Sequence, residues 1–278
     1  MKVVLLDGYN LLYRSYHSSK RFSKGKDWGF VYQFFRSLRP LIEKFNPDVT
    51  YFVLEGYPQW RHEISKNYKG SRTRIEDDSF RKEKRKIIEM MTSLFPITVA
   101  RHPDQECDDV IGNLIWKAHA DDDCVIVSTD SDFIQMINNP KVKLYNPIKK
   151  SYTSYPNYDY VTWKALRGDG ADDIEGFPGI GDKRAEMLVT DPEKLDKFLS
   201  EGNRIKKFHE NLKLINFTDI QDMNKINFSS SISNWDEIEK TFLEFGFHSM
   251  VSKPKTWKKY KDTFISLEKF NDRKIIAS

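Results

Sequence analysis

The chain has 278 residues, of which 39% are hydrophobic and 31% charged, with a formal net charge of +4. This composition indicates a soluble globular protein, and the absence of any run of ~18 apolar residues excludes a membrane-spanning helix. The only two cysteines, Cys107 and Cys124, predict a reducing compartment without structural disulfides. Because the amino terminus also lacks a signal-peptide pattern, we expect a cytoplasmic protein.

Apolar segments that end at an acidic residue recur along the first half of the chain. A helical segment at residues 29–45 separates the first two, which makes a βαβ unit with parallel strands. Ligands bind off the carboxyl ends of parallel strands, so we expect one shared acidic edge. Further short strands are predicted at residues 97–100 and 142–145. The three segments with an acidic end are residues 3–6 before Asp7, residues 49–54 before Glu55, and residues 124–128 before Asp130.

Residues 57–95 have a basic character. Between Trp60 and Lys86, ten Lys or Arg residues stand against five Asp or Glu residues. For residues 81–86 a solvated helical face is the simpler explanation. Residues 61–74 show little apolar periodicity, so we expect a projecting element whose cations and aromatic rings suit a nucleic-acid strand. The basic residues of this part are Arg61, Lys66, Lys69, Arg72 and Arg74, with Tyr68 among them.

Three further groups of acids follow. Glu106, Asp108 and Asp109 open a predicted helix at residues 110–119, where one or two acids would suffice as caps. Thr129-Asp130-Ser131-Asp132-Phe133 closes an apolar strand, and its two carboxylates can lie on the same side. A capped turn is the simpler reading of that motif taken alone. The third group is Gly168-Asp169-Gly170-Ala171-Asp172.

A glycine hairpin at residues 176–181 precedes a helix that contains Lys183 and Arg184. Backbone N–H groups in such a turn can bind phosphate, although an ordinary tight turn is the common alternative. No Walker A or Rossmann pattern is present, which argues against a nucleotide cofactor. The chain after residue 191 is helical and polar, and its basic stretch at residues 253–261 is better explained as a solvated face.

Nine carboxylates would meet if the sheet forms as predicted. Nine carboxylates in one cleft would raise one another's pKa, and bound divalent cations would neutralise this repulsion. The all-oxygen donor set favours Mg²⁺ or Mn²⁺ over Zn²⁺. Setting these nine charges aside changes the net charge of the rest from +4 to +13, so a basic body surrounds an acidic pit. Two metal ions in such a pit can hydrolyse a phosphodiester. The nine are Asp7, Glu55, Glu106, Asp108, Asp109, Asp130, Asp132, Asp169 and Asp172.

These motifs resemble the structure-specific 5′-nuclease family over residues 1–190. The family includes flap endonucleases, the 5′-exonuclease domain of bacterial DNA polymerase I, and phage 5′-exonucleases of the ribonuclease H type. A segment at residues 211–217 is more similar to the phage members. The motifs that carry the resemblance are Leu6-Asp7-Gly8 with Arg14, the strand ending at Glu55, Arg61 with Tyr68-Lys69 and Arg72, Glu106-Cys107-Asp108-Asp109, Thr129-Asp130-Ser131-Asp132, Gly168-Asp169 with Asp172, and the glycine hairpin.

The resemblance implies a PIN-like α/β nuclease core with a mainly parallel sheet at residues 1–160, whose residues 57–95 form an arch. A helical region at residues 161–278 would contain a helix–hairpin–helix element at residues 174–190, often with a bound K⁺. The first metal group would be Asp7, Glu55, Glu106 and Asp108, with Asp109 near both ions, and the second Asp130, Asp132, Asp169 and Asp172. Because the family usually has Asp where this chain has Glu55, direct ligation by Glu55 is the least secure of these assignments.

The resemblance also implies DNA contacts and a catalytic role for the arch. Lys69 and Arg72 would reach the scissile phosphate, Asp109 would be the third catalytic residue, and Tyr68 would offer a stacking face. The expected DNA-binding residues are Arg14, Arg61, Lys66, Tyr68, Lys69, Arg72, Gly176, Gly179, Gly181, Lys183 and Arg184.

The activity so implied is a metal-dependent 5′-to-3′ exonuclease and flap endonuclease, with possible ribonuclease H activity, that removes RNA primers and 5′ flaps during replication. It would act as a monomer, in the host cytoplasm if phage-encoded. Two alternatives stay open: a PIN-type ribonuclease that acts on RNA, and a branched-DNA-binding protein whose nuclease has decayed. The sequence leaves open whether it meets a single-strand-binding protein, a clamp or a polymerase.

Overall fold

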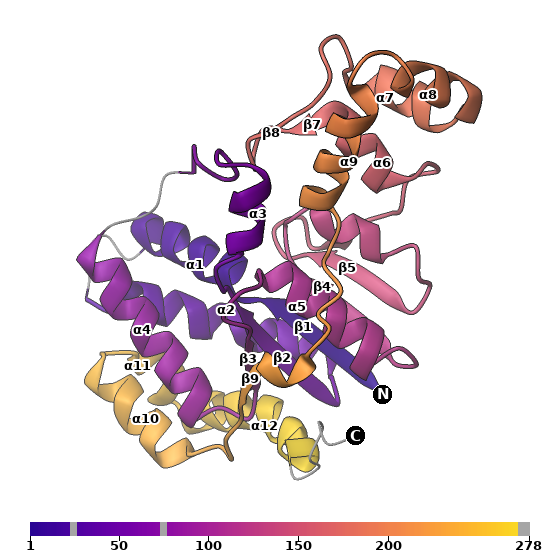
Figure 1. Cartoon of the computed structure of the whole chain (residues 1–278). Coiled ribbons are helices and arrows are strands. Elements are labelled where there is room, and N and C mark those ends of the chain that lie inside the picture. Colours follow the sequence, from indigo (N-terminus) through magenta and orange to yellow (C-terminus); the bar gives the residue numbers. More distant parts are fainter. Residues whose placement is uncertain (23–26, 73–76, 272–278) are drawn as a thin grey trace.

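The computed structural model describes residues 1–22, 27–72 and 77–271 (Figure 1). Arg74, one of the basic residues singled out above, lies outside these ranges. No helix within them is long and apolar enough to cross a membrane.

A seven-stranded sheet with the order β6-β5-β4-β1-β2-β3-β9 forms the centre of the molecule. The five inner strands are parallel, and the short strands β6 and β9 pair antiparallel at the two edges. This confirms the predicted α/β class with a mainly parallel sheet. The strands are β1 (Lys2–Asp7), β2 (Val49–Leu54), β3 (Thr98–Arg101), β4 (Asp123–Val127), β5 (Val142–Asn146), β6 (Ser151–Tyr152) and β9 (Asn227–Ser229).

Helices cover the sheet, and a small hairpin of β7 (Gly168–Asp169) and β8 (Ile174–Glu175) stands apart from it. The predicted helix at residues 110–119 begins earlier, as α5, and continues as a π-helix at Leu114–Ala118. The helices are α1 (Gly8–Phe22), α2 (Gly29–Phe45), α3 (Gln59–Ile64), α4 (Asp78–Ser93), α5 (Cys107–Asn113), α6 (Tyr160–Arg167), α7 (Asp182–Val189), α8 (Pro192–Leu199), α9 (Arg204–Ile215), α10 (Trp235–Glu244), α11 (His248–Val251) and α12 (Pro254–Asn271).

Both faces of the sheet are buried, because side chains alternate along each strand. Val4 and Leu6 of β1 point to a core shared with α1, α2, α4 and the C-terminal helices α10 to α12. Val3 and Leu5 point to the opposite core, against α5. Figure 1 shows the yellow C-terminal helices beside α2 and α4, far along the sequence from them.

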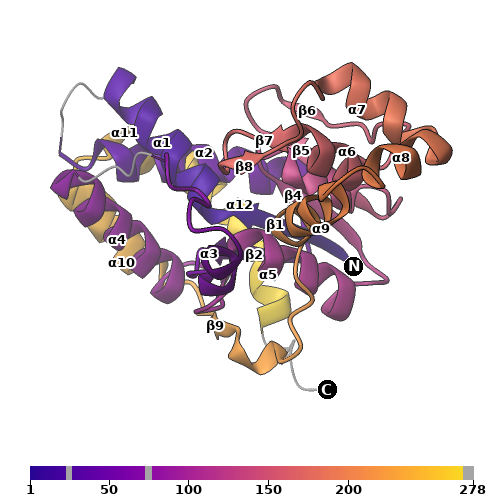
Figure 2. The same cartoon turned by 45° about the horizontal axis from the view of Figure 1, so that its top comes forward.

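A third apolar cluster holds α6, α7, α8 and α9 together on one side of the molecule (Figure 2). Among the described residues, Tyr68, which precedes α4, is the one member of this cluster from the first half of the chain. After α9 the chain returns to the central sheet through β9. The expected division into a core at residues 1–160 and a helical region at residues 161–278 stays a prediction.

Candidate active site

The first group of carboxylates lies where β1, β2 and β4 end. Because these strands are parallel neighbours, their carboxyl ends share one edge of the sheet. Asp7, the last residue of β1, accepts hydrogen bonds from the Ser128 hydroxyl at 2.6 Å and from the backbone N–H of Asn10 at 3.0 Å. Burial raises the pKa of Asp7 to about 6 in spite of these donors, and Asp130 contributes to the rise.

Glu55 and Asp108 join this group. Glu55 Oε2 accepts a hydrogen bond at 2.8 Å from the backbone N–H of Cys107, the first residue of α5. Burial, and then the Glu106 carboxylate, raise the pKa of Glu55 to about 7. The pKa of Asp108 is also well above its ordinary value, through burial and the charges of Asp130 and Asp7.

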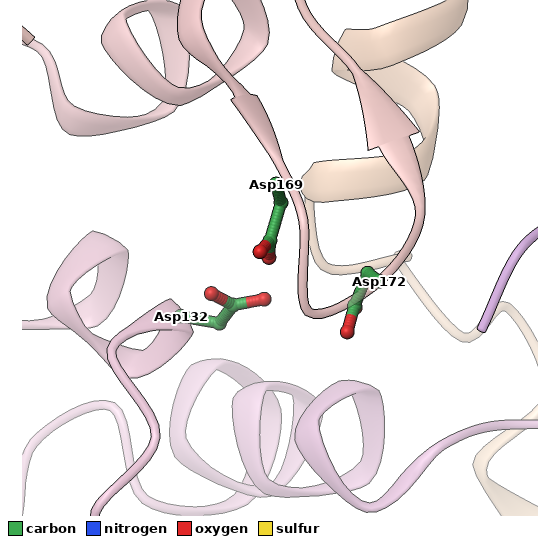
Figure 3. A group of neighbouring side chains, drawn as sticks. All are labelled: Asp132, Asp169 and Asp172. Carbon is green, nitrogen blue, oxygen red and sulfur yellow. The ribbon is translucent and has the colours of Figure 1, made fainter. Parts of the chain in front are cut away.

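Asp132, Asp169 and Asp172 form the second group (Figure 3). Each offers one carboxylate oxygen, and these oxygens all lie within 4.8 Å of one another. Asp132 opens a 3-10 helix after β4, Asp169 ends β7, and Asp172 lies in the loop before β8. Burial and the Asp130 charge raise the pKa of Asp132 to about 7.

Lys164 of α6 is a member of the second group that the sequence did not indicate. It is 3% exposed, and its ammonium pairs with Asp132 and, at 2.6 Å, with Asp169. Burial would raise the pKa of Asp169, but the Lys164 charge outweighs it and the pKa is lowered. Asp132 lies 32 residues before Lys164, so no local pattern indicated that pair, whereas Asp169 follows Lys164 by only five residues.

The segment at residues 68–72, part of the predicted arch, lies across both groups. Lys69 Nζ is 2.5 Å from Glu106 Oε1 and 3.6 Å from Asp172 Oδ2. Arg72 also pairs with Asp172. Lys69 adopts a left-handed backbone conformation (φ 53°), and its N–H donates to the Asp172 carbonyl at 3.0 Å. Such conformations are costly for residues with a side chain, so these contacts hold Lys69 in place.

Arg61, Tyr68 and Asp109 are placed differently from the expectation. Arg61 is 2% exposed, and its guanidinium lies 2.6 Å from both Glu106 and Asp109. Asp109 is fully buried and also accepts the Thr218 N–H. Tyr68 is 2% exposed, with its hydroxyl donating to Glu106 at 2.8 Å. In this structure Arg61 and Tyr68 offer no surface to DNA, and Asp109 faces a guanidinium instead of open space.

The first group opens into a cavity of about 1000 Å³ with a basic and aromatic rim. Its lining includes Arg14 from α1, Lys84 from α4 and the predicted catalytic pair Lys69 and Arg72. Lys66 lies on the exposed surface nearby. Of the predicted cations, Arg14, Lys69 and Arg72 therefore line the cavity that holds the acids, as a polyanionic substrate would require.

The glycine hairpin is less uniform than expected. A Cβ on Gly176 would lie 2.0 Å from the Arg167 carbonyl oxygen, so this glycine serves close backbone packing. Gly179 needs its positive φ of 73°, whereas Gly181 has open space around it. The two cations that follow, Lys183 and Arg184, are exposed on α7. The helix–hairpin–helix assignment stays a prediction.

Two other positioning residues were missed. The Asn10 side chain donates to the Thr129 hydroxyl at 2.6 Å and accepts from the Thr129 N–H, which fixes the loop after β4 to the start of α1. The Ser128 hydroxyl also accepts from the Asp130 N–H. The sequence signal that could have indicated Ser128 is its position as a polar residue directly after the apolar strand β4.

The donor set fits hard divalent cations. Nine carboxylates face four cations, of which Arg61 and Lys164 are buried, Lys69 is half-buried and Arg72 is exposed, so five negative charges remain. In the described part of the chain, no ion pair reaches Asp7, Asp108 or Asp130. Burial and the neighbouring carboxylates raise the pKa of Asp7 and Asp108, and a bound cation would offset this. Carboxylate oxygens are ligands that Mg²⁺ and Mn²⁺ prefer.

The fold resembles solved nuclease structures. One is bacteriophage T5 5′-exonuclease with bound zinc ions, at 20% identity and a TM-score of 0.64 over 96% of this chain and all of that one. Another is the catalytic core of Rad2 in complex with a DNA substrate, at 16% identity and a TM-score of 0.55 over 96% of this chain and 91% of that one.

Sequence relatives agree with this fold. A 5′-3′ exonuclease of Mycoplasmopsis pulmonis is 29% identical over 221 residues, which is 74% of this chain and 73% of that protein. The thermostable DNA polymerase I of Thermus aquaticus is 28% identical over 216 residues, 74% of this chain, but the match spans only 26% of the polymerase.

Fold and site together define a 5′-nuclease, an enzyme that hydrolyses phosphodiester bonds. The family model described as the 5′-3′ exonuclease, N-terminal resolvase-like domain, matches residues 2–164, more than half of the chain. The protein therefore belongs to the 5′-3′ exonuclease family.

Proposed function

We propose that this nuclease is a metal-dependent, structure-specific enzyme that cuts flapped, nicked or RNA-primed DNA near a 5′ end. The observation that carries the proposal is the convergence of two carboxylate groups at the sheet edge, beside a cavity rimmed by cations. An acidic centre suits metal ions, and a basic rim suits a polyanionic strand.

Two divalent ions, Mg²⁺ or Mn²⁺, would occupy the two groups. The first would be held by Asp7, Asp108, Glu106 and Asp130, with Glu55 at its edge. Asp130, expected in the second group from the resemblance, is moved to the first because it lines the cavity together with Asp7 and Asp108. Because Glu55 caps α5 through one oxygen, we assign it an outer role. The second would be held by Asp132, Asp169 and Asp172. Bound ions would activate water and stabilise the leaving oxygen. The buried pair of Asp109 and Arg61 is reassigned to holding α3 against α5.

The chain's own residues would orient the reaction. Ser128 and Asn10 fix the Asp7 carboxylate by hydrogen bonds to both oxygens. Lys69 and Arg72 stand at the cavity wall and would hold the oxygens of the scissile phosphate, neutralising its developing charge. Asp172 and Glu106, their present partners, would then share their charge with the metal ions.

The substrate class follows from the relatives. A T5 flap endonuclease structure is described as a pseudo-enzyme-product complex with DNA and metal ions, and the Rad2 structure holds a DNA substrate. We infer branched or RNA-primed DNA as the substrate, with exposed Lys66, Lys183 and Arg184 as phosphate contacts and K⁺ at the glycine hairpin. The free cysteines fit a reducing cytoplasm, where replisome proteins would be partners of a monomeric enzyme.

A substrate panel tests the proposal. A 5′-flap duplex, a nicked duplex, an RNA-primed duplex and single-stranded RNA are incubated with Mg²⁺, and parallel samples contain EDTA. We expect cuts near the junction, with 5′-phosphate and 3′-hydroxyl ends, in the first three substrates only. Cleavage of the single-stranded RNA alone would instead identify a PIN-type ribonuclease. Tight binding of the flap duplex without any cleavage would identify a branched-DNA-binding protein.

A further inference from the structure

A second cavity of about 470 Å³ lies between α1, α2 and the segment after β5. Arg14 lines this cavity and also the active-site cavity, so the two adjoin at α1. The second cavity has Lys44 and Lys150 on its wall and no carboxylate among its lining residues. Its charge is therefore opposite to that of the carboxylate groups.

The Arg14 guanidinium is half-buried without a charge partner. Among the described residues it has neither an ion pair nor a hydrogen bond. Burial lowers its pKa, and the one group that opposes this is the Tyr145 hydroxyl. A cation taken partly out of water without a partner is costly, which indicates that an anion supplies the missing charge when bound.

A buried hydroxyl on the cavity wall has the same problem. Ser15 is 2% exposed, and its hydroxyl is buried without a hydrogen-bond partner. Gln33 makes no hydrogen bond within the described part of the chain, and its amide reaches solvent. Both residues line the cavity. Buried hydroxyls nearly always have partners, and an accessible amide can donate a hydrogen bond, so both groups are suited to the oxygens of a ligand.

The two lysines complete an anion site. The Lys44 ammonium lies 5.0 Å from the centre of the Tyr145 ring, a cation–π contact that keeps it at the cavity wall. Lys150 is exposed in the turn between β5 and β6, with a left-handed backbone conformation (φ 55°). Three cations, a hydroxyl and an amide around one volume match a phosphate group.

We propose that this cavity, lined by Arg14, Ser15, Gln33, Lys44 and Lys150, binds a backbone phosphate of a nucleic-acid strand that continues from the active-site cavity across α1. The inference rests on the proposed function and extends it, because it places the substrate strand on a second, metal-free contact. Arg14 is the link, since a strand in the main cavity passes it before it reaches the second one.

Fluorescence anisotropy with a labelled 5′-flap duplex at several salt concentrations tests the site. The variant K44A/K150A is compared with K2A/K141A, which removes the same charge near the amino ends of β1 and β5, at the opposite edge of the sheet. A phosphate contact makes log Kd depend on log salt with a slope of ~0.9 per phosphate. We expect K44A/K150A to lower the slope by about 1 and K2A/K141A to leave it unchanged.

A second variant separates binding from folding. Ser15→Ala removes the unpartnered hydroxyl, so it should leave Tm unchanged or slightly higher while DNA affinity falls severalfold. Equal slopes for the two lysine variants, with normal DNA affinity of S15A, would overturn the inference. A rise in Tm with inorganic phosphate that is lost in K44A/K150A, together with unchanged DNA affinity in every variant, would also overturn it. Failure of the wild-type protein to bind or cut the flap would instead refute the proposed function.

Discussion

Buried carboxylates without a paired cation are the most costly groups in this structure, and Asp7, Glu55 and Asp108 are of this kind. Each carries a raised pKa because burial and its neighbours disfavour the charged form. The fold tolerates them through donors such as Ser128, and their cost marks the edge of the sheet as functional.

A stability measurement without metal tests this electrostatic description. The raised pKa values, about 6 for Asp7 and about 7 for Glu55 and Asp132, mean that the native state binds more protons than the unfolded state between pH 4 and 7. Stability should therefore fall as pH rises from 5.5 to 7.5, by on the order of 1 kcal/mol for Asp7 alone. Burial lowers the pKa of His102, so this group makes stability rise with pH. It is a single group, and the three carboxylates have the opposite effect.

Calorimetry in EDTA at pH 5.5 and pH 7.5 provides the readout. Mg²⁺ replaces the bound protons, so its addition should raise Tm more at pH 7.5 than at pH 5.5. A Tm that rises with pH in EDTA, or that Mg²⁺ leaves unchanged at pH 7.5, would contradict the assignment of these carboxylates to a metal site.

Lys69 gives a sharper test at the residue scale. Its ammonium stands in the cavity against Glu106 and Asp172, where a scissile phosphate would lie. Lys69→Met should lower kcat on a saturating flap substrate by roughly 10²–10³, the effect of losing one donor to developing charge. Lys66→Met, an exposed change three residues away, should alter kcat by less than threefold. Similar kcat values for the two variants would remove Lys69 from the chemistry.

At the scale of elements, the arch region begins with a buried ion pair. Arg61 on α3 is bound to Asp109 and Glu106 at the start of α5 and to the carbonyl of Asn216 after α9. Three segments far apart in sequence thus meet at one guanidinium. Its role is to anchor α3, from which residues 68–72 extend across the carboxylates.

Arg61→Ala should destabilise the protein strongly, because it leaves Asp109 charged, buried and unpaired. Loss of one partner of a buried pair costs about 3–5 kcal/mol. Urea unfolding measures this, with Lys66→Ala as a surface control expected within about 0.5 kcal/mol of wild type. If Arg61→Ala unfolded like wild type and only bound DNA more weakly, the earlier expectation that Arg61 contacts DNA would hold.

The predictable parts of the site are those that follow from the pattern of a single strand or helix. Asp7 and Asp130 were predictable because each follows an apolar strand, and parallel strands must share an edge. The burial of Arg61 was not, because a basic segment looks the same whether one guanidinium turns inward or outward. Lys164 was missed since its partners come from other elements. The edge strand β9 has only three residues, too few for a periodic pattern.

On the scale of the whole molecule, the chain's last helices belong to the core that supports the site. Phe242 and Tyr260 pack in the same cluster as Phe35 of α2 and Phe52 of β2. The antiparallel strand β9 also closes the sheet beside β3. The core that supports the carboxylates thus depends on contacts between residues more than 200 positions apart, such as Phe35 and Phe242.

Deletion of residues 227–278 should therefore abolish cooperative folding. Each large apolar side chain buried here contributes about 1.5–3 kcal/mol, and a folded domain is stable by only about 5–15 kcal/mol. Circular dichroism during heating provides the measurement, with deletion of residues 272–278 as the control. A shortened chain that still melts cooperatively and cleaves DNA would show that residues 1–226 fold alone.

The most direct measurement of the central claim is single-turnover cleavage of a 5′-labelled flap duplex by wild type and Asp130→Ala, with Mg²⁺ and with EDTA. Asp121→Ala, an exposed change at the opposite edge of the sheet, is the control. We predict junction cleavage by wild type and Asp121→Ala in Mg²⁺, and none in EDTA or with Asp130→Ala. Cleavage that survives EDTA or the loss of Asp130 would contradict a metal-dependent centre at this edge.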